Sequence, residues 1–381
     1  MSTSGLLGPY FMSLLHTPLN NPSSSGAHDG AQNGAAANGD ARLLQLKTWL
    51  QGLGIVDAAS ARPASADASF RRYFRLDVLP DAQARLGVNF GATLVAMDAP
   101  PERENTAAFV KVDALLADAG VSVPAIHAQD LDQGFLLLSD LGTTTYLQAL
   151  NHDNAATLYA EALSALVEIQ LRSQPGVLPE FDRAFMLREL NIFPEWYIGK
   201  HLNATLTEAQ SATLQKVFDH IIATCLAQPQ VFMHRDYHSR NLMWMDEKNP
   251  GILDFQDAVY GPITYDAASL LRDAYVSWDE ELVLDWIIRY WQHAKAAGLP
   301  VNKDFDAFYR DFEYMALQRH LKILGLFCRL NYRDGKPQYL GDLPTVMEYV
   351  RHTANRYREL KPLVKLLDDL ENRQPAVGYT F

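Results

Sequence analysis

The sequence contains 381 residues, of which 48% are hydrophobic and 20% are charged, the proportions of an ordinary soluble globular protein. A chain of this length can bury a large core, and we expect two lobes and a tail. The formal net charge of −12 argues against non-specific binding to nucleic acids and to anionic membrane surfaces.

Cysteine content and hydropathy are typical of a cytoplasmic protein. Cys225 and Cys328 lie far apart, so neither a disulfide framework nor a cysteine-based zinc site is predicted. No apolar run reaches the roughly 18 residues that a membrane-spanning helix needs. The first 41 residues contain no Lys or Arg to flank a secretory signal. We therefore predict a cytoplasmic protein that binds neither nucleic acid nor membrane.

The chain begins with a low-complexity segment. Residues 1–40 are rich in Ser, Asn, Gly, Ala and Pro, and cannot bury enough apolar surface to offset the entropy lost on ordering. We therefore predict a disordered extension. From Arg42 onward, apolar residues at helical spacing predict a helix that packs on the first lobe.

A small sheet-rich lobe is expected over residues 41–141. Alternating aromatic and charged residues predict a strand, a turn and a second strand within 65–78. A buried strand is expected at 92–100, ended by two prolines that cannot pair in a ladder. The remaining predictions for this lobe are an amphipathic helix over 104–120 and a buried strand over 134–142.

Helical periodicity dominates the second lobe, expected over residues 142–381. Tyr159, Leu163 and Leu166 share one face of a predicted core helix over 154–172. Further helical patterns occur at 206–227, 279–297, 304–330 and 345–370. The predicted fold class is therefore α+β, with a small sheet-rich lobe and a larger, mainly helical one.

One stretch of the second lobe carries the chemistry. His234-Arg235-Asp236 followed by Asn241 reproduces the H-R-D-x-x-x-x-N spacing of kinases. Asp236 is predicted to face the attacking hydroxyl, and Asn241 the metal ion that neutralises the phosphate. Asp254, at the end of a short apolar strand, supplies the charged metal ligand. The alternative is a chance coincidence in a surface loop, and the apolar strands on both sides argue against it.

These segments resemble the aminoglycoside phosphotransferase-like branch of the protein-kinase-like two-lobe fold. The motifs that carry the resemblance are DASFRRYFR, LLLSDLG, HRDYHSRNLMW and ILDFQDAVYGPITYDAASLLRD. Within that branch, VAMDAPPERENTAAFV and LKILGLFCRLNYRDGKPQYL are most similar to the kinases that phosphorylate the anomeric hydroxyl of N-acetylmuramate and N-acetylglucosamine in cell-wall recycling.

The resemblance implies ATP and Mg²⁺ as cofactors and a small-molecule sugar as substrate. It implies that Asp236 accepts or orients the hydroxyl proton, and that Asp266 accepts hydrogen bonds from the catalytic-loop backbone. An N-cap for the helix from Ala267 is the alternative for Asp266. We interpret His234 as a loop-ordering residue. His238 and Arg240 either touch the substrate or are solvated loop side chains.

The predicted nucleotide site departs from the kinase pattern. The third strand reads LVAMD, so Asp98 stands where kinases place a lysine, and the glycine-rich loop is absent. We hypothesise that Arg72 supplies the missing positive charge and that Ser69 offers a hydroxyl or backbone N–H. Surface arginines on a hairpin are the alternative. The other predicted nucleotide-binding residues are Ser139 and Leu141.

A basic segment is the candidate acceptor site. Residues 317–340 hold five Lys or Arg against one acid, in a chain that is acidic overall. Arg319, Arg329 and Arg333 are therefore candidates to bind a sugar that carries a carboxylate. A solvated helix and turn is the alternative interpretation.

The preferred function is an ATP- and Mg²⁺-dependent sugar kinase. The alternatives are a kinase for another alcohol, such as an aminoglycoside, choline or homoserine, and a nucleotide-binding pseudokinase without turnover. The presence of all three residues Asp236, Asn241 and Asp254 argues against the pseudokinase. The sequence does not determine the oligomeric state.

Overall fold

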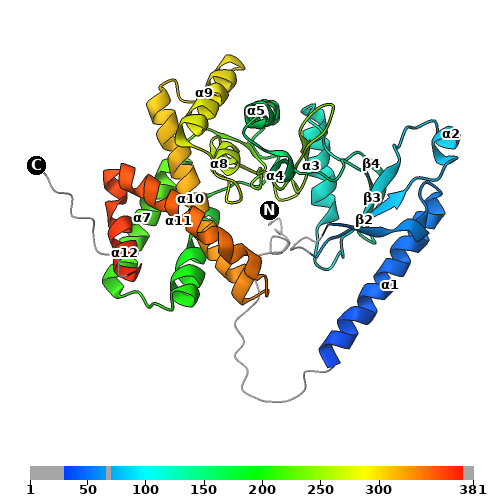
Figure 1. The fold of residues 1–381 in the computed structure, drawn as a ribbon, viewed down its shortest axis with the longest axis horizontal. Helices are drawn as coiled ribbons and strands as arrows, with labels where there is room; N and C mark the ends of the chain where they lie inside the picture. Colours follow the sequence, from blue (N-terminus) through cyan, green and yellow to red (C-terminus); the bar gives the residue numbers. More distant parts are fainter. Residues whose placement is uncertain (1–29, 66–69, 372–381) are drawn as a thin grey trace, which may run out of the picture. The chain divides into compact units, whose positions relative to one another are not determined.

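The structure, a computed structural model, describes residues 30–65 and 70–371, which divide into two compact units (Figure 1). The first unit contains the described residues up to Asp113 together with Pro124–Leu141, and the second contains Ala114–Val123 and the chain from Gly142 onward. Ala114–Val123 belongs to the second unit, although we expected it in the first lobe.

Two hydrogen bonds explain why this segment joins the second unit. The Ser122 carbonyl accepts the backbone N–H of Ile252 at 2.8 Å, and the Ser122 hydroxyl donates to the carbonyl of Lys248 at 2.6 Å. Residues 122 and 251 also form a parallel bridge.

The first unit is built on a five-stranded antiparallel sheet. Its strand order is β1-β2-β3-β5-β4. The strands span Arg62–Ser65 (β1), Arg72–Asp77 (β2), Thr93–Asp98 (β3), Ile126–Asp130 (β4) and Phe135–Ser139 (β5). The predicted strand pair within 65–78 therefore starts earlier, at residue 62.

Helix α1, Gly30–Leu53, covers one face of this sheet (Figure 1). Leu46 and Leu50 of α1 are fully buried against Leu94 and Ala96 of β3 and other core residues. Positions 94 and 96 share a face because strand side chains alternate. Of the extension predicted over residues 1–40, residues 1–29 lie outside the described part of the chain. Residues 30–40 belong to α1, in line with the high helix propensity of their alanines.

Three further helical elements belong wholly or partly to the first unit. They are η1 (Ala58–Ser60), α2 (Ala82–Leu86) and α3 (Thr106–Asp118), the last of which begins there and ends in the second unit. Helix α3 lies within the range predicted for the amphipathic helix.

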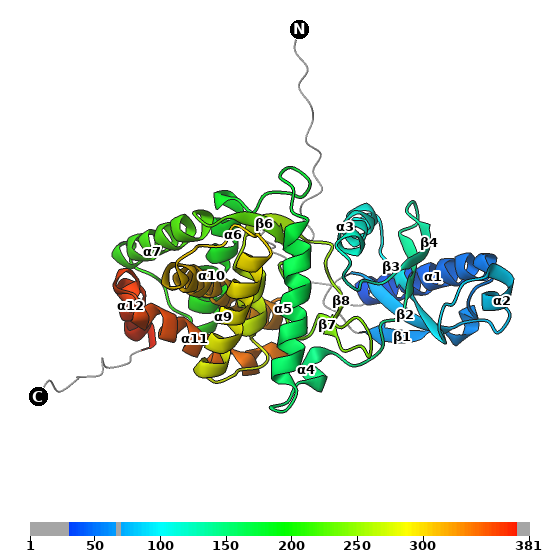
Figure 2. The ribbon, with the colours of Figure 1, turned by 90° about the horizontal axis from the view of Figure 1, so that it is seen from above.

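The second unit is mainly helical. Its α-helices are α4 (Tyr146–Ala149), α5 (Ala155–Leu171), α6 (Arg183–Ile192), α7 (Glu208–Leu226), α8 (Tyr265–Leu271), α9 (Glu280–Ala296), α10 (Phe305–Tyr332), α11 (Leu343–Arg356) and α12 (Lys361–Glu371). A π-helix, η2 (Phe193–His201), continues α6, and short 3₁₀ turns form η3 (Pro337–Asp342) and η4 (Arg358–Leu360). Helices α5 and α9 lie side by side (Figure 2).

Helix α10 is the central element of this unit. It packs against η2, α11, α8, α7 and α6, and most of its residues between 308 and 329 are buried. Gly325 lets it approach the chain where α6 passes into η2, because a Cβ at this position would overlap the backbone of Ile192 and Phe193. The single helical pattern expected over 345–370 is two helices, since Tyr357 is extended and Pro362 cannot continue a helix.

Two antiparallel pairs of short strands hold the catalytic segment. Strand β6 (Gln230–Met233) pairs with β9 (Val259–Pro262), and β7 (Leu242–Met243) pairs with β8 (Gly251–Ile252). The loop between β6 and β7 carries the predicted catalytic residues, and the residues after β8 carry Asp254.

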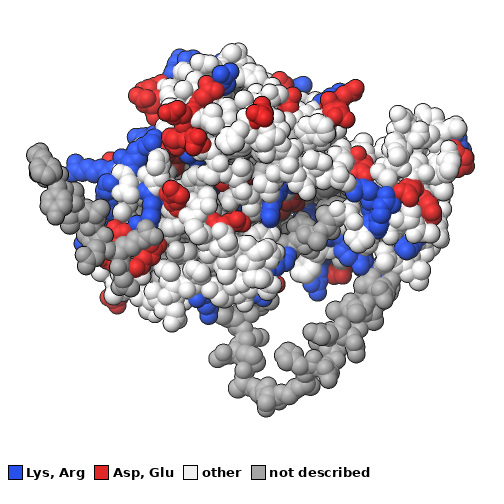
Figure 3. Space-filling view, viewed as in Figure 1, with Lys and Arg blue, Asp and Glu red and all other residues white. Residues whose placement is uncertain are grey.

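The surface and the hydropathy of the helices add two observations. On the face drawn in Figure 3, acidic and basic side chains of the described residues are interspersed in small groups. Over residues 30–65 and 70–371, none of the helices combines the length and the apolar character that crossing a bilayer requires.

Candidate active site

Asp266 fixes the backbone of the catalytic loop. Strand β6 ends at Met233, and the next residues, His234 and Arg235, donate their backbone N–H groups to the two carboxylate oxygens of Asp266 at 2.7 and 3.0 Å. Asp266 lies in the first turn of α8, whose N-cap is Thr264, so the alternative N-cap interpretation of Asp266 is wrong. Burial raises the pKa of Asp266 to about 7, while the backbone N–H groups favour the carboxylate and oppose this rise.

The His234 imidazole connects the loop to the strand that precedes Asp254. Its Nε2–H donates to the Leu253 carbonyl at 3.0 Å, and its Nδ1 accepts the backbone N–H of Asp236 at 3.3 Å. These two bonds require a neutral ring with its proton on Nε2. Burial lowers the pKa of His234 to about 4, which keeps the ring neutral at physiological pH. This geometry supports the interpretation of His234 as a loop-ordering residue.

The Asp236 carboxylate is ionised and open to a ligand. Among the residues that the structure describes, no donor makes a hydrogen bond to its carboxylate oxygens. Burial alone would raise the pKa of Asp236, but the charges of Lys322, Arg235, His238 and Arg319 outweigh this effect and hold it well below its usual value. The group can therefore accept a hydrogen bond from a hydroxyl at any pH near neutrality.

Glu189 of α6 balances these cations and was not identified from the sequence. Its carboxylate pairs with Arg235 and with Lys322, each at 3.0 Å, and accepts the amide of Gln318 at 3.1 Å. Arg319 donates from Nη1 to the backbone carbonyl of Arg235 at 2.7 Å. One buried acid thus fixes a cationic layer behind Asp236. No local pattern marks Glu189, because its partners lie far away in the sequence.

Asn241 and Asp254 form a pair whose oxygen atoms suit a magnesium ion. The Asn241 amide nitrogen donates to the Asp236 carbonyl at 2.9 Å and lies 3.4 Å from Asp254 Oδ2. This leaves the Asn241 amide oxygen as a neutral ligand beside a carboxylate, the hard donor set that Mg²⁺ prefers. Asp254 has φ +61°, a conformation that costs energy for a residue other than glycine and that is concentrated at ligand sites.

Asp273 is a second loop-fixing acid that was not identified from the sequence. It is buried, and its Oδ2 accepts both the backbone N–H and the hydroxyl of Ser239, at 3.0 and 2.5 Å. Its Oδ1 accepts the backbone N–H of Tyr275 at 3.1 Å. The loop that carries Asp236 and the segment that carries Tyr275 are therefore held by one carboxylate.

In the first unit, Asp98 lies between two arginines. Its side chain is fully buried, and its oxygens accept Nε of Arg42 and Nε of Arg72, each at 2.9 Å. The acid that stands in place of the kinase lysine therefore forms ion pairs with both arginines. Arg71, the neighbour of Arg72, lies 3.5 Å from Glu104 in a second buried pair.

The other predicted nucleotide-binding residues also lie in the first unit. The Ser139 hydroxyl accepts the backbone N–H of Ala125 at 2.8 Å, at the end of β5. Leu141 is the last residue of this unit and is half-buried. Ser69 lies outside the described residues.

The three candidate acceptor-binding arginines of the C-terminal segment have different surroundings. Arg319 is buried and donates to the catalytic loop, as described above. Arg329 is buried, and within the described part of the chain its Nε has no hydrogen-bond partner. Arg333 pairs with its neighbour Asp334 at 2.7 Å. The structure therefore brings only Arg319 to the catalytic loop by direct contact.

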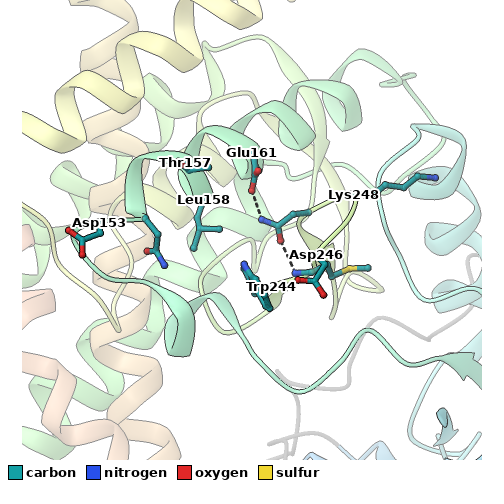
Figure 4. Close-up of a pocket in the computed structure, with 10 residues that line it drawn as sticks. Asp153, Thr157, Leu158, Glu161, Trp244, Asp246 and Lys248 are labelled. Atoms are coloured by element: carbon teal, nitrogen blue, oxygen red, sulfur yellow. Dashed lines mark hydrogen bonds between the residues drawn. The ribbon is translucent and has the colours of Figure 1, made fainter. Parts of the chain in front are cut away.

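A pocket of about 390 Å³ lies elsewhere on the second unit (Figure 4). Asn249 donates to Glu161 of α5 and accepts the backbone N–H of Met245 at 3.1 Å. Trp244 and Asp246 complete part of its wall. The lining includes none of the predicted catalytic or metal-binding residues.

Comparisons with known proteins agree with this geometry. A family model described as "Phosphotransferase enzyme family" matches residues 60–300. The chain is 49% identical over 342 residues to an N-acetylmuramate/N-acetylglucosamine kinase of Pseudomonas putida, covering 87% of this chain and 97% of that protein. It is 47% identical over 345 residues to a protein of the same name from Neisseria meningitidis, covering 89% of this chain and 99% of that one.

A solved structure is similar in fold alone. The ADP-bound aminoglycoside phosphotransferase APH(2'')-Ib has a TM-score of 0.54 at 13% identity, covering 80% of this chain and 97% of that chain. The fold of the present chain is protein-kinase-like, with a small antiparallel sheet in one unit and a mainly helical second unit.

Proposed function

Because the chain belongs to the phosphotransferase enzyme family, we propose that it is an ATP- and Mg²⁺-dependent kinase of N-acetylmuramate and N-acetylglucosamine. The acceptor is the anomeric hydroxyl, and the place of the reaction is cell-wall recycling in the cytoplasm. One observation carries the catalytic part of this proposal: the Asp236 carboxylate is open to a ligand. The backbone carbonyl of Asp236 accepts a hydrogen bond from the Asn241 amide, which lies beside Asp254. The sugar is proposed from the relatives.

Phosphoryl transfer needs positioning and charge stabilisation more than strong base catalysis. Asp236 accepts a hydrogen bond from the anomeric hydroxyl and orients its oxygen towards the γ-phosphorus. The new bond joins the sugar oxygen to this phosphorus, the bond to the ADP oxygen breaks, and the hydroxyl proton leaves by way of Asp236. Asn241 and Asp254 would hold Mg²⁺, whose charge would neutralise that of the phosphates.

The arginine pair in the first unit supports the nucleotide part of the proposal. Arg42, Arg72 and Asp98 carry two positive charges and one negative charge, a net +1, which is the charge of the lysine that kinases place at this strand position. Arg72 is the more exposed arginine, at 35% against 22% for Arg42. We therefore assign phosphate binding to Arg72, with Ser69, Ser139 and Leu141 as further nucleotide-binding residues.

The decisive experiment is phosphorus NMR of the products from a panel of acceptors with ATP and Mg²⁺. The panel contains the two amino sugars, choline, homoserine and an aminoglycoside. We expect sugar 1-phosphates from both amino sugars and a loss of turnover of roughly a hundred- to ten-thousandfold in Asp236→Asn. Phosphorylation of another alcohol alone would replace the substrate, and nucleotide binding without any product would identify a pseudokinase.

A further inference from the structure

One exposed cation lies inside the catalytic loop. Arg240 follows Asp236 by four residues and precedes Asn241, and its side chain is exposed. Its guanidinium carbon lies 4.0 Å from the ring centroid of Tyr275 and 5.7 Å from that of Tyr339. Across the described residues, no acceptor makes a hydrogen bond or an ion pair with this guanidinium.

The position of this guanidinium is fixed rather than adjustable. Asp273 holds the backbone N–H of Ser239, next to Arg240, and the backbone N–H of Tyr275, whose ring lies against the guanidinium. The Tyr275 ring also contacts His238 at 5.4 Å and Phe327 at 5.9 Å between centroids. An arginine stacked on an aromatic ring keeps the N–H groups at its edge available for a bidentate carboxylate.

The loop geometry keeps Arg240 close to Asp236. Four residues span at most about 14 Å even when fully extended. Here the loop is folded by a bond from His238 N–H to the Asp236 carbonyl at 3.1 Å and another from Asn241 N–H to the His238 carbonyl at 2.9 Å. The backbone of Arg240 therefore lies within about 14 Å of that of Asp236, so its guanidinium can reach a substituent of a sugar whose anomeric hydroxyl lies at Asp236.

The two amino sugars of the proposed function differ at one group. N-acetylmuramate carries a lactyl ether with a carboxylate, and N-acetylglucosamine carries a hydroxyl there. A site that accepts both needs a cation that can bind the carboxylate when it is present and that stays solvated when it is absent. Arg319 and Arg329 are buried and Arg333 is paired with Asp334, so these three arginines do not have this character.

We propose that Arg240, supported by the Tyr275 ring, binds the lactyl carboxylate of N-acetylmuramate and so determines the preference between the two sugars. This proposal rests on the proposed function. Two acids lie near Arg240. Asp342, at the end of η3, experiences its charge, and Asp273, whose oxygens accept from Ser239 and Tyr275, holds the residue before it. Neither forms an ion pair with it in the described structure.

The test measures kcat/KM for three acceptors in the wild type, Arg240→Ala, Arg333→Ala and Arg289→Ala. The acceptors are N-acetylmuramate, its methyl ester and N-acetylglucosamine. In Arg240→Ala we expect a loss of roughly 10- to 100-fold for N-acetylmuramate, the effect of removing a charged hydrogen bond, and a change below about threefold for the other two. Arg333→Ala tests the competing candidate of the C-terminal segment. Arg289→Ala, which removes an exposed arginine paired with Asp285 on α9, is the matched control and keeps the wild-type ratios.

Three outcomes overturn the inference. They are an equal loss for all three acceptors in Arg240→Ala, unchanged values for all three, and a changed preference in Arg333→Ala instead. Tyr275→Leu should reproduce part of the Arg240→Ala pattern, and Tyr275→Phe should restore the wild-type ratio. If the wild type phosphorylates neither amino sugar, the proposed function fails; if it phosphorylates both and Arg240→Ala leaves the ratio unchanged, only this inference fails.

Discussion

Arg72 and Arg42 share one carboxylate but differ in exposure and in sequence context. Arg72 begins β2, whereas Arg42 lies on α1 and also donates to the Gln133 carbonyl at 2.8 Å. The two substitutions Arg72→Ala and Arg42→Ala remove the same formal charge from the same cluster. A comparison of the two variants therefore shows whether nucleotide binding depends on the position of the arginine or only on the net charge of the cluster.

For Arg72→Ala we expect the KM for ATP to rise about tenfold or more, because a charged hydrogen bond to a phosphate is lost. Steady-state kinetics at saturating sugar measure this value. Arg42→Ala is the control, with an expected change below about threefold. An unchanged KM in Arg72→Ala would remove the phosphate-binding role, and equal rises would assign the effect to net charge.

His320 makes stability depend on pH. It is buried in α10, its Nε2–H donates to the Arg272 carbonyl at 2.8 Å, and its ring stacks on Tyr349 at 4.8 Å. Burial and the nearby Arg319 and Arg272 charges lower its pKa to about 3. Because the unfolded chain binds this proton near pH 6.5 and the folded chain does not, stability is lost as the pH falls below 6.5.

From pH 7 to pH 5, the wild type should lose about 2 kcal/mol more of its free energy of unfolding than His320→Gln does. Only this difference is informative, since Asp113 and Asp311, whose pKa values burial raises to about 6, act in the opposite direction. Urea titrations of both proteins at the two pH values measure it. Parallel losses would show that His320 is not buried as a neutral ring.

At the scale of elements, the crossing of α10 and η2 depends on Gly325. A glycine inside a helix normally weakens it, and alanine is the better helix former by about 1 kcal/mol. At position 325 we expect alanine to lower the stability instead, because an added methyl would lie 2.7 Å from the backbone nitrogen of Phe193 and closer still to Ile192. The backbone of η2 cannot yield as a flexible side chain would.

We expect Gly325→Ala to destabilise the protein by about 2 kcal/mol, the usual cost of overpacking a core. Gly52→Ala is the control: Gly52 lies near the end of α1 with nothing within 4 Å of an added Cβ. It should stabilise by up to about 1 kcal/mol. Denaturant unfolding of both variants measures the difference, and a stabilised Gly325→Ala would contradict the close crossing.

Elements with a clear period could be predicted, and elements whose form depends on distant contacts could not. Strand β3 and helix α5 follow the alternating and helical patterns of their residues. The α6–η2 segment contains Pro194, which reads as a break, yet the chain stays helical because α10 packs against it.

The same distinction holds for the candidate site. The fixed spacing of Asp236 and Asn241 predicted the candidate catalytic loop, and the structure brings these two residues and Asp254 together. Glu189, Asp273 and the Tyr275 ring were not found, because their contacts with Arg235, Ser239 and Arg240 span 34 or more positions in the sequence. No single-sequence pattern records such a contact.

For the whole molecule, metal-bound nucleotide should add stability through Asp254. A ligand that binds only the folded chain stabilises it by about 2.7 kcal/mol at a hundred times its Kd. We therefore expect ATP with Mg²⁺ to raise the Tm of the wild type by a few degrees. In Asp254→Asn the rise should fall to the level seen with ATP and EDTA.

Differential scanning fluorimetry measures these shifts. Asp246→Asn, which changes an exposed acid of the pocket in Figure 4, is the control and should keep the full shift. An equal shift with and without the metal in the wild type would show that Asp254 and Asn241 do not hold Mg²⁺.

The buried carboxylate of Asp98 also restricts how this chain could change over time. Exchanging it for the lysine found in most kinases would put three cations together, a net +3, with the lysine at the fully buried position. Such a step is tolerable only if Arg42 and Arg72 are lost as well. Substitutions at these three positions therefore depend on one another. Reagents designed to acylate the strand lysine of kinases find no amine at position 98.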